Sequence, residues 1–494
     1  MVAQVVVRDV RLVDGTGAPG VEGSVAIEGE RIAAVGDVPG SSVGPETIEI
    51  DGAGRTLSPG FVDVHTHDDG ALLRYPGMEF KLAQGCTSVV IGNCGFSAAP
   101  AVEGETDPSN LIGVAPTWTD LAGFAAAVDA AKPSVNTMAL IGHNTVRHLV
   151  MGYERRDPTA AELATMRDMV AAGMAQGACG FSSGLVYEPG RYCKTDELVA
   201  LAEPSASVGG LYASHIRNEG DRLLEAVDEA IAIGNQAKLA VQLSHHKAAG
   251  RRNWGKVAQS LARVDEANAA GADITLDVYP YTAGSGPMAQ YFNLDRIDPE
   301  LAEVIRFASC PAFRHYEGRM AVDLAAEQGV TASDVVREVL TAPKGNQTIC
   351  IQFIIDEADI ATNLEHPLMM VGSDGIPDLN GLPHPRLFGT FPKVLSHYVR
   401  DEGVLPLEDA IRRMTSLSCD RFGFAERGRI AEGNFADLVL FDPATVVDTA
   451  TYDEPKQEPT GIELVMVNGE IAFQGGEHTG VGSGRFLKYD ASAG

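Results

Sequence analysis

The sequence predicts an α/β fold: a TIM-type (β/α)8 barrel with a small β-sandwich domain built from both ends of the chain. Eight short apolar runs alternate with helical segments through the middle of the sequence, which indicates a parallel sheet covered by helices. Histidine, cysteine and aspartate recur where these runs stop. Both ends read instead as short strands, and 494 residues suit one large domain with an accessory domain.

The two ends of the chain, residues 1–56 and 425–494, carry alternating apolar and polar positions separated by glycine-rich turns. The Asn468-Gly469 pair between two such stretches is typical of a tight hairpin. Because chain termini often lie close together, we expect the two ends to build one β-sandwich domain, with the tail from Gly480 ending loosely.

The middle of the chain, residues 57–424, is expected to form the barrel. Thr159 and Glu162 are spaced as a capping box at the start of one of its helices. The connection between the last two strands is longer than one helix requires, so part of residues 285–345 is expected to be an insertion over the barrel mouth. The eight expected strands span residues 61–65, 87–92, 138–142, 178–182, 211–215, 239–244, 274–279 and 368–374.

The composition argues against several classes of protein. A formal net charge of -29, from 38 basic and 67 acidic residues, opposes binding to nucleic acid or to anionic membranes. We find no apolar run long enough to span a bilayer, and the amino terminus lacks the pattern of a secretory signal. Seven scattered cysteines without a CxxC spacing argue against a disulfide framework, so we expect buried thiols and a cytoplasmic protein.

Polar side chains follow most of the expected strands at the point where each strand ends. In a barrel of this kind the carboxyl ends of the strands converge on one rim, where catalytic groups lie. Imidazole, thiolate and carboxylate are the ligands that zinc prefers. The residues concerned are His65, His67, Cys94, His143, His215, His245, His246, Tyr279 and Asp374.

A metal site at this rim has simpler alternatives. The HxH pair of His65 and His67 is weak evidence alone, although alternate residues of an extended segment point the same way and can grip one cation. His215 alone would more often be a structural histidine, and its place beside other ligand candidates favours a metal role. Of the neighbours His245 and His246 only one can face the metal, and strand parity selects His245.

Asp374, in the VGSDG segment at the end of the last strand, is the expected general base and acid. A carboxylate beside an activated water can take its proton and deliver it to the nitrogen that must leave. The alternative is a turn aspartate before Gly375. The position at a strand end favours the catalytic role.

Eight segments carry a family resemblance: HTHDD, GNCG, SHIRNEGD, SHHK, YPYTAGS, GSDG, HPRLFGTF and RGRIAEGNFADLVLFDP. In this order they resemble the D-aminoacylase (N-acyl-D-amino-acid deacylase) family of the amidohydrolase superfamily. The resemblance implies a zinc-dependent enzyme that hydrolyses the amide of an N-acyl-D-amino acid to a carboxylate and a free D-amino acid.

The resemblance also implies a metal site in which Cys94 replaces the carboxylated lysine that bridges two metals in many relatives. Asp374 would be the catalytic acid and base. The implied ligands are Cys94, His215 and His245 for one tight zinc site, with His65 and His67 available for a second, weaker site.

The same resemblance implies how the substrate is held. Arg386 would bind the substrate carboxylate through two parallel hydrogen bonds. Tyr279, Ser285 and Lys247 match further substrate contacts, although Lys247 could equally be a solvated lysine after a strand. His143 lies at the expected rim and could contact metal-bound oxygen or substrate; it is grouped with the substrate contacts and has no ligand role.

Three other functions stay open from the sequence. A cyclic-amide hydrolase of the dihydropyrimidinase or dihydroorotase kind uses the same barrel, but the lysine-type bridge is missing here. A catalytically inactive barrel kept as a binding protein should have lost a metal-site or catalytic residue, and all are present. A redox protein using Cys94 lacks a second nearby thiol in sequence. The segments after Ser285 and at 346–357 differ from the sequences more common in the family, so the preference for the substrate side chain stays open. The acyl-chain length, the number of metals and the oligomeric state also stay open.

Overall fold

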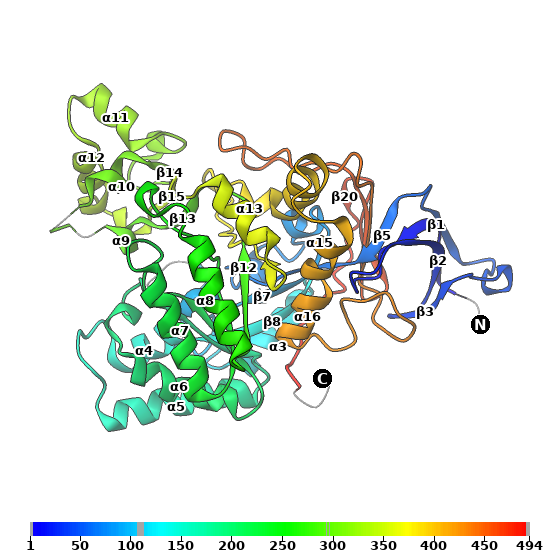
Figure 1. The fold of residues 1–494 in the computed structure, drawn as a ribbon, viewed down its shortest axis with the longest axis horizontal. Helices are drawn as coiled ribbons and strands as arrows, with labels where there is room; N and C mark the ends of the chain where they lie inside the picture. The colour runs from blue at the N-terminus through cyan, green and yellow to red at the C-terminus, as the bar shows by residue number, and fades with distance from the viewer. Residues whose placement is uncertain (1–2, 106–112, 293, 296, 491–494) are drawn as a thin grey trace.

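The centre of the molecule is a parallel barrel of eight strands, in a computed structural model that describes residues 3–105, 113–292, 294–295 and 297–490 (Figure 1). A bridge between Thr66 and Gly375 brings the first and last strands together, which confirms the predicted fold class. The strands are buried almost throughout, as parallel strands covered by helices must be. They are β6 (Phe61–Asp63), β7 (Cys86–Ile91), β8 (Asn136–Gly142), β9 (Gly180–Gly184), β10 (Leu211–His215), β11 (Ala240–Leu243), β12 (Ile274–Val278) and β16 (Met369–Val371).

Helices cover the outside of the barrel (Figure 1). The predicted capping box is present, because Thr159 N donates to Glu162 Oε2 at 2.7 Å and Glu162 N donates to Thr159 Oγ1 at 3.3 Å. The helices are α1 (Ala71–Arg74), α2 (Glu79–Leu82), α3 (Leu121–Ala131), α4 (His143–Met151), α5 (Ala160–Ala175), α6 (Thr195–Ala206), α7 (Leu223–Ala237), α8 (Val257–Ala269), α13 (Glu357–Glu365), α14 (Arg386–Lys393), α15 (Leu407–Met414) and α16 (Ser416–Phe422).

Both ends of the chain join one separate sheet, at the right of Figure 1. Its strands are β1 (Val5–Leu12), β2 (Val21–Glu28), β3 (Arg31–Gly36), β4 (Ile48–Asp51), β5 (Thr56–Pro59), β17 (Leu438–Phe441), β18 (Ile462–Val467), β19 (Glu470–Gln474) and β20 (Glu477–His478). Strand β5 pairs with β17 and thereby links the two ends. The hairpin at Asn468-Gly469 forms, with both residues at positive φ. The boundaries at 56/57 and 424/425 stay predictions.

The connection between β12 and β16 carries a small unit with its own hydrophobic core, at the upper left of Figure 1. It contains a three-stranded antiparallel sheet in the order β13-β15-β14. Residues 293 and 296 of this predicted insertion lie outside the described residues. The elements are β13 (Gly284–Pro287), α9 (Met288–Tyr291), α10 (Pro299–Glu303), β14 (Ile305–Ser309), α11 (Ala321–Gln328), α12 (Ala332–Thr341) and β15 (Ile349–Gln352).

The expectation of a loose tail is wrong for the part of it that the structure describes. Leu487 N donates to Thr137 O at 2.7 Å, and Thr137 N donates to Arg485 O at 2.9 Å, so the tail pairs with barrel strand β8. The buried ring of Phe486 packs on Phe124. These backbone pairs and the apolar contact hold the segment on the barrel; residues 491–494 lie outside the described part.

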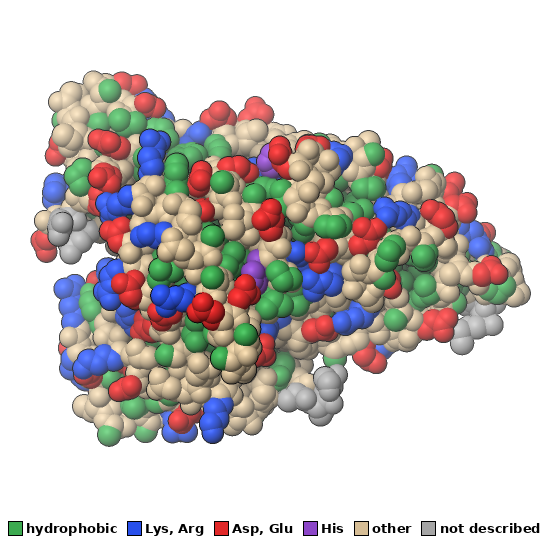
Figure 2. All heavy atoms as spheres, in the orientation of Figure 1, with side chains coloured by type: hydrophobic (Ala, Val, Ile, Leu, Met, Phe, Trp, Pro, Cys, Tyr) green, Lys and Arg blue, Asp and Glu red, His purple; other side chains and the backbone are tan. Residues whose placement is uncertain are grey.

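Two surface features bear on partners. Among the described residues, no helix is long and apolar enough to cross a membrane. Figure 2 shows acidic and basic side chains intermingled over the face that it draws.

Candidate metal centre and active site

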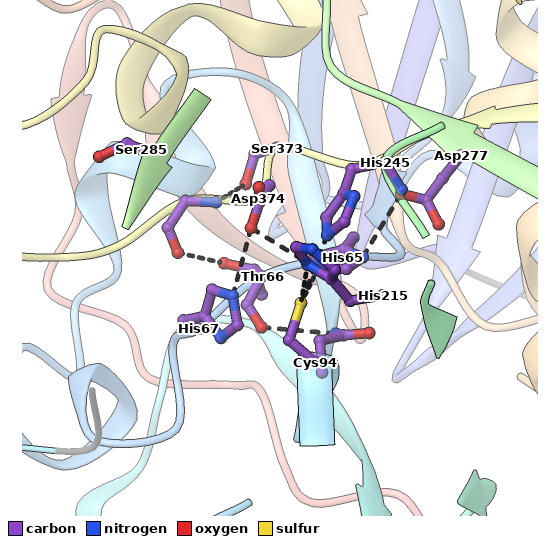
Figure 3. A network of polar contacts seen from close by, with 12 residues as sticks. His65, Thr66, His67, Cys94, His215, His245, Asp277, Ser285, Ser373 and Asp374 are labelled. Carbon is purple, nitrogen blue, oxygen red and sulfur yellow. Dashed lines mark hydrogen bonds and ion pairs between the residues drawn. The ribbon is translucent and has the colours of Figure 1, made fainter. Parts of the chain in front are cut away.

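The residues that follow the barrel strands converge at one rim (Figure 3). His65 and His67 follow β6, Cys94 follows β7, His215 ends β10 and His245 follows β11. Cys94 Sγ lies 3.3 Å from His65 Nε2, 3.7 Å from His215 Nδ1 and 3.4 Å from His245 Nε2. A thiol and three imidazoles from four different strands therefore face one small space.

The surroundings of Cys94 favour the thiolate form of its side chain. Burial disfavours a thiolate, but the imidazoles of His65 and His245 outweigh burial and hold the pKa of Cys94 well below its usual value. The thiolate is the form that binds a metal.

Three residues of this rim have a positive φ, a backbone conformation that residues other than glycine rarely adopt. They are Cys94 at φ 54°, His245 at φ 35° and Asp374 at φ 49°. The turn around Cys94 is made possible by its neighbour Gly95, where an added Cβ would lie 2.5 Å from Asn144 Oδ1. Backbone strain of this kind clusters at functional sites. Each strained residue points its side chain at the same space (Figure 3).

Asp374 lies at the edge of this cluster. Its Oδ1 is 3.2 Å from His67 Nε2 and 3.6 Å from His65 Nε2, and its Oδ2 is 3.0 Å from Arg386 Nη2. Burial raises the pKa of the carboxyl, yet Arg386, His245 and His67 together hold the pKa of Asp374 well below its usual range. The side chain is thus a carboxylate, which is the form a general base requires.

Two acidic residues that sequence reasoning missed brace the histidines. Glu219 lies with Oε1 3.0 Å from His245 Nδ1 and with Oε2 3.6 Å from His215 Nε2. Asp277 accepts a hydrogen bond from His245 N at 2.7 Å and lies 3.4 Å from His65 Nδ1. Carboxylates of this kind orient ligand imidazoles and raise their basicity. Asp277 had one available signal, a charged residue inside the apolar run ITLDV.

Two groups of side chains around Cys94 could hold a metal, and within each group the ligand atoms lie within 4.8 Å of one another; a third such group, of His143, Cys193 and Glu197, does not include Cys94. Sulfur and imidazole nitrogen suit zinc, and all members are buried, which favours tight binding. Cys94 belongs to both groups. The first group is Cys94, His215 and His245; the second is His65, His67, Cys94 and Asp374.

His246, the neighbour of His245, faces away from this space. Its Nδ1 lies 2.7 Å from Asn363 Oδ1 and its Nε2 lies 2.8 Å from Ser260 Oγ. Burial lowers the pKa of His246 to about 4, so the ring is neutral. This arrangement agrees with the strand-parity argument that selects His245.

His143 begins α4, and its Nε2 lies 2.9 Å from Glu197 Oε1. Arg147 binds the same carboxylate through Nη1, so Glu197 already has a positive partner. The predicted contact of His143 with substrate stays a prediction, and this pairing favours a structural role.

Three other predicted substrate contacts, Lys247, Tyr279 and Ser285, line a cavity of about 710 Å³ between the barrel rim and the insertion. Lys247 and Tyr279 follow barrel strands, whereas Ser285 and Tyr291 belong to the insertion. Asp374 lines the same cavity, so the walls of the cavity extend to the metal-site cluster. This cluster consists of His65, His67, Cys94, His215, His245 and Asp374. Lys247 is not a freely solvated lysine, because it is buried and its Nζ lies 2.5 Å from Glu219 Oε1.

Arg386 begins α14 and is fully buried beside Asp374. Its guanidinium carbon lies 4.5 Å from the ring centre of Tyr279, and its Nη2 donates to Ser285 O at 3.1 Å. Among the described residues, Arg386 Nε and Nη1 and the Tyr279 hydroxyl find no hydrogen-bond partner. Buried donors without partners are rare, so these atoms are available to an anionic group of a ligand.

Known proteins share this architecture. A model of the amidohydrolase family matches residues 49–293 and 225–473. Over 97% of its length the chain is 42% identical to N-acyl-D-glutamate deacylase and 41% identical to D-aminoacylase, both of Alcaligenes xylosoxydans xylosoxydans and each covered to 96%. The crystal structure of N-acyl-D-glutamate deacylase from Bordetella bronchiseptica, complexed with zinc and a phosphonate inhibitor, is 38% identical. It has a TM-score of 0.91, with 99% of this chain and 100% of that chain covered.

Proposed function

This chain belongs to the D-aminoacylase family of the amidohydrolases, and from that premise we propose that it is a zinc-dependent N-acyl-D-amino-acid deacylase. It hydrolyses the linear amide of its substrate and releases a carboxylate and a free D-amino acid. Zinc is its cofactor, as in the related deacylase whose structure contains zinc.

One observation carries this function: the thiol of Cys94 faces the imidazoles of His65, His215 and His245, with the carboxylate of Asp374 beside them. We assign Cys94, His215 and His245 to a tight zinc site, and His65 and His67 to a second, weaker site. The chemistry that zinc supplies when bound is a water molecule of lowered pKa and a positive charge beside the carbonyl oxygen.

The protein's own residues position and move the proton. Asp374 is a carboxylate because Arg386, His245 and His67 lower its pKa against burial, so it can accept a proton from the attacking water. It then donates that proton to the amide nitrogen, which must be protonated before it can leave. Glu219 and Asp277 hold the imidazoles in place during these steps.

The substrate carboxylate is bound at the side of the cavity where unpartnered donors meet. Tyr279 offers its hydroxyl beside Lys247 in this cavity, and Arg386 offers Nε and Nη1 directly behind the Tyr279 ring, where it lines a small adjoining cavity that shares Ser285 with the large one. A planar guanidinium matches the two oxygens of a carboxylate. This arrangement suits a linear N-acyl amino acid better than a cyclic amide, which has no free carboxylate beside the amide that is cleaved.

Two further features fit this function. All seven cysteines are buried and unpaired, which suits a reducing compartment, so we place the enzyme in the cytoplasm. The net charge of -29 opposes contact with nucleic acid, so the partner is the small-molecule substrate.

An assay of the purified zinc enzyme separates this function from its rivals. We expect hydrolysis of N-acetyl-D-amino acids, with little turnover of their L enantiomers or of the cyclic amide dihydrouracil. Turnover of dihydrouracil alone would show a cyclic-amide hydrolase instead of a deacylase. Binding of these compounds without turnover would indicate a catalytically inactive barrel.

A further inference from the structure

Two cavities of very different size meet at Asp374. The large cavity, of about 710 Å³, and a small one, of about 10 Å³, share the lining residues Tyr187, Ser285 and Asp374. The small cavity also touches Cys94 and His67 of the metal-site cluster. The amide to be cleaved must lie against this cluster, so its two halves extend into different cavities.

The amino-acid half belongs in the large cavity. Lys247 and Tyr279, which suit a carboxylate, line that cavity and do not line the small one. Arg386 lines neither cavity, but its guanidinium carbon lies 4.5 Å from the ring centre of Tyr279 and so on the side of the large cavity. The acyl half is therefore left with the small cavity. Its walls include the apolar side chains of Phe96, Pro287 and Ile376, which suit a hydrocarbon group.

The size of the small cavity limits what can enter it. A cavity needs about 10–15 Å³ to hold one water molecule, and a methyl group is somewhat larger than water. The small cavity, of about 10 Å³, therefore leaves room for no acyl group larger than acetyl. A longer chain would have to displace a packed wall, which is costly.

A third cavity lies behind that wall. It has a volume of about 220 Å³, and its walls include Trp118 of the segment between β7 and α3 and Leu149 of helix α4. The two side chains that line both this outer cavity and the small one are Phe96 and Gln290.

Both of these side chains are held in place. The ring of Phe96 is 6% exposed and lies 5.7 Å from the ring of Tyr187. Gln290 Oε1 accepts a hydrogen bond from Glu188 N at 3.0 Å. Neither contact involves the metal-site cluster, so the wall can be altered without removing a ligand.

We propose that Phe96 and Gln290 form a wall that restricts the acyl group of the substrate to acetyl size. This inference rests on the deacylase activity proposed above. Removing the wall joins the small cavity to the outer cavity and admits acyl chains of four to six carbons.

The test compares kcat/KM of the zinc-loaded enzyme for the N-acetyl, N-butanoyl and N-hexanoyl derivatives of one D-amino acid. We expect kcat/KM of the wild type to fall by more than about tenfold from acetyl to butanoyl, because a hydrophobic pocket discriminates by about 10- to 200-fold for a single methylene and butanoyl adds two. Phe96→Ala should raise the ratio of hexanoyl to acetyl kcat/KM by at least about tenfold. Competitive inhibition by hexanoate, set against acetate, should strengthen in the same variant and reports binding without turnover.

Two further variants keep the test decisive. Gln290→Ala opens the other side of the wall and should raise the same ratio if Phe96→Ala does not fold. Leu149→Ala enlarges only the outer cavity and should leave the ratio unchanged. Zinc content is measured for each variant, so that a lost ligand site is not mistaken for altered specificity.

Three results would contradict the inference, and they can be told apart. The first is equal kcat/KM for the acetyl and hexanoyl derivatives in the wild type, and the second is an unchanged ratio in folded, zinc-replete Phe96→Ala and Gln290→Ala. Either result would refute the proposed wall and would leave the proposed deacylase activity unaffected. Failure to hydrolyse any N-acyl-D-amino acid would overturn the proposed function and this inference with it.

Discussion

Asp374 Oδ2 and Arg386 Nη2 lie 3.0 Å apart in a buried ion pair at the barrel rim. The pair joins the proposed proton-transfer group to the proposed carboxylate-binding group. The guanidinium contributes to the low pKa of Asp374, and its remaining unpartnered donors are available to substrate. Substrate binding and proton transfer therefore depend on the same arginine.

Arg386→Lys should weaken substrate binding, because an ammonium group cannot replace the planar fork of donors. We expect KM for an N-acetyl-D-amino acid to rise about 10- to 100-fold, from the loss of charge-assisted hydrogen bonds worth about 1.5–3 kcal/mol. Steady-state kinetics measure this. A KM equal to that of the wild type would refute the assignment of Arg386 to carboxylate binding.

Asp374→Asn should remove most turnover and retain the zinc of the tight site, because the amide cannot accept or donate the transferred proton. General acid and base catalysis contributes about 10²- to 10⁴-fold, and we expect a loss of kcat in this range. Stopped assays with parallel metal analysis give both quantities. Full activity in the zinc-loaded variant would refute the acid and base assignment.

Glu219→Gln should weaken zinc binding, because the carboxylate that orients His245 and His215 becomes neutral. Loss of such a partner costs about 10- to 100-fold in metal affinity. Competition with a chelator measures the affinity. Glu203→Gln, which alters an exposed pair with Arg167, is the matched control and should bind zinc as the wild type does.

His143→Ala should lower stability rather than substrate affinity, because His143 pairs with Glu197 inside the protein. We expect the free energy of unfolding to fall by about 1–3 kcal/mol, since Glu197 loses a buried hydrogen-bond partner. Denaturant unfolding and KM are measured on the same preparation. A raised KM with unchanged stability would restore the substrate contact that the sequence suggests.

The barrel and its rim residues are predictable because most of the apolar runs stop at a polar residue, and strand ends of a barrel meet at one edge. Glu219 is not predictable in this way. It lies in the irregular SHIRNEGD loop, where nothing in the spacing shows which polar side chain turns inward. The tail against Thr137 and the wall at Phe96 depend on packing between segments far apart in sequence.

The zinc content of Cys94→Ala tests the central claim most directly, because this thiol belongs to both groups of ligands assigned to the zinc sites. Cys179→Ala is the matched control, since Cys179 is also a buried thiol on the barrel, and its thiol donates to the carbonyl of Ala139 rather than facing the histidines. We predict that Cys94→Ala loses its tightly bound zinc and its deacylase activity, while Cys179→Ala keeps both. A folded Cys94→Ala protein with the zinc content of the wild type would contradict the account.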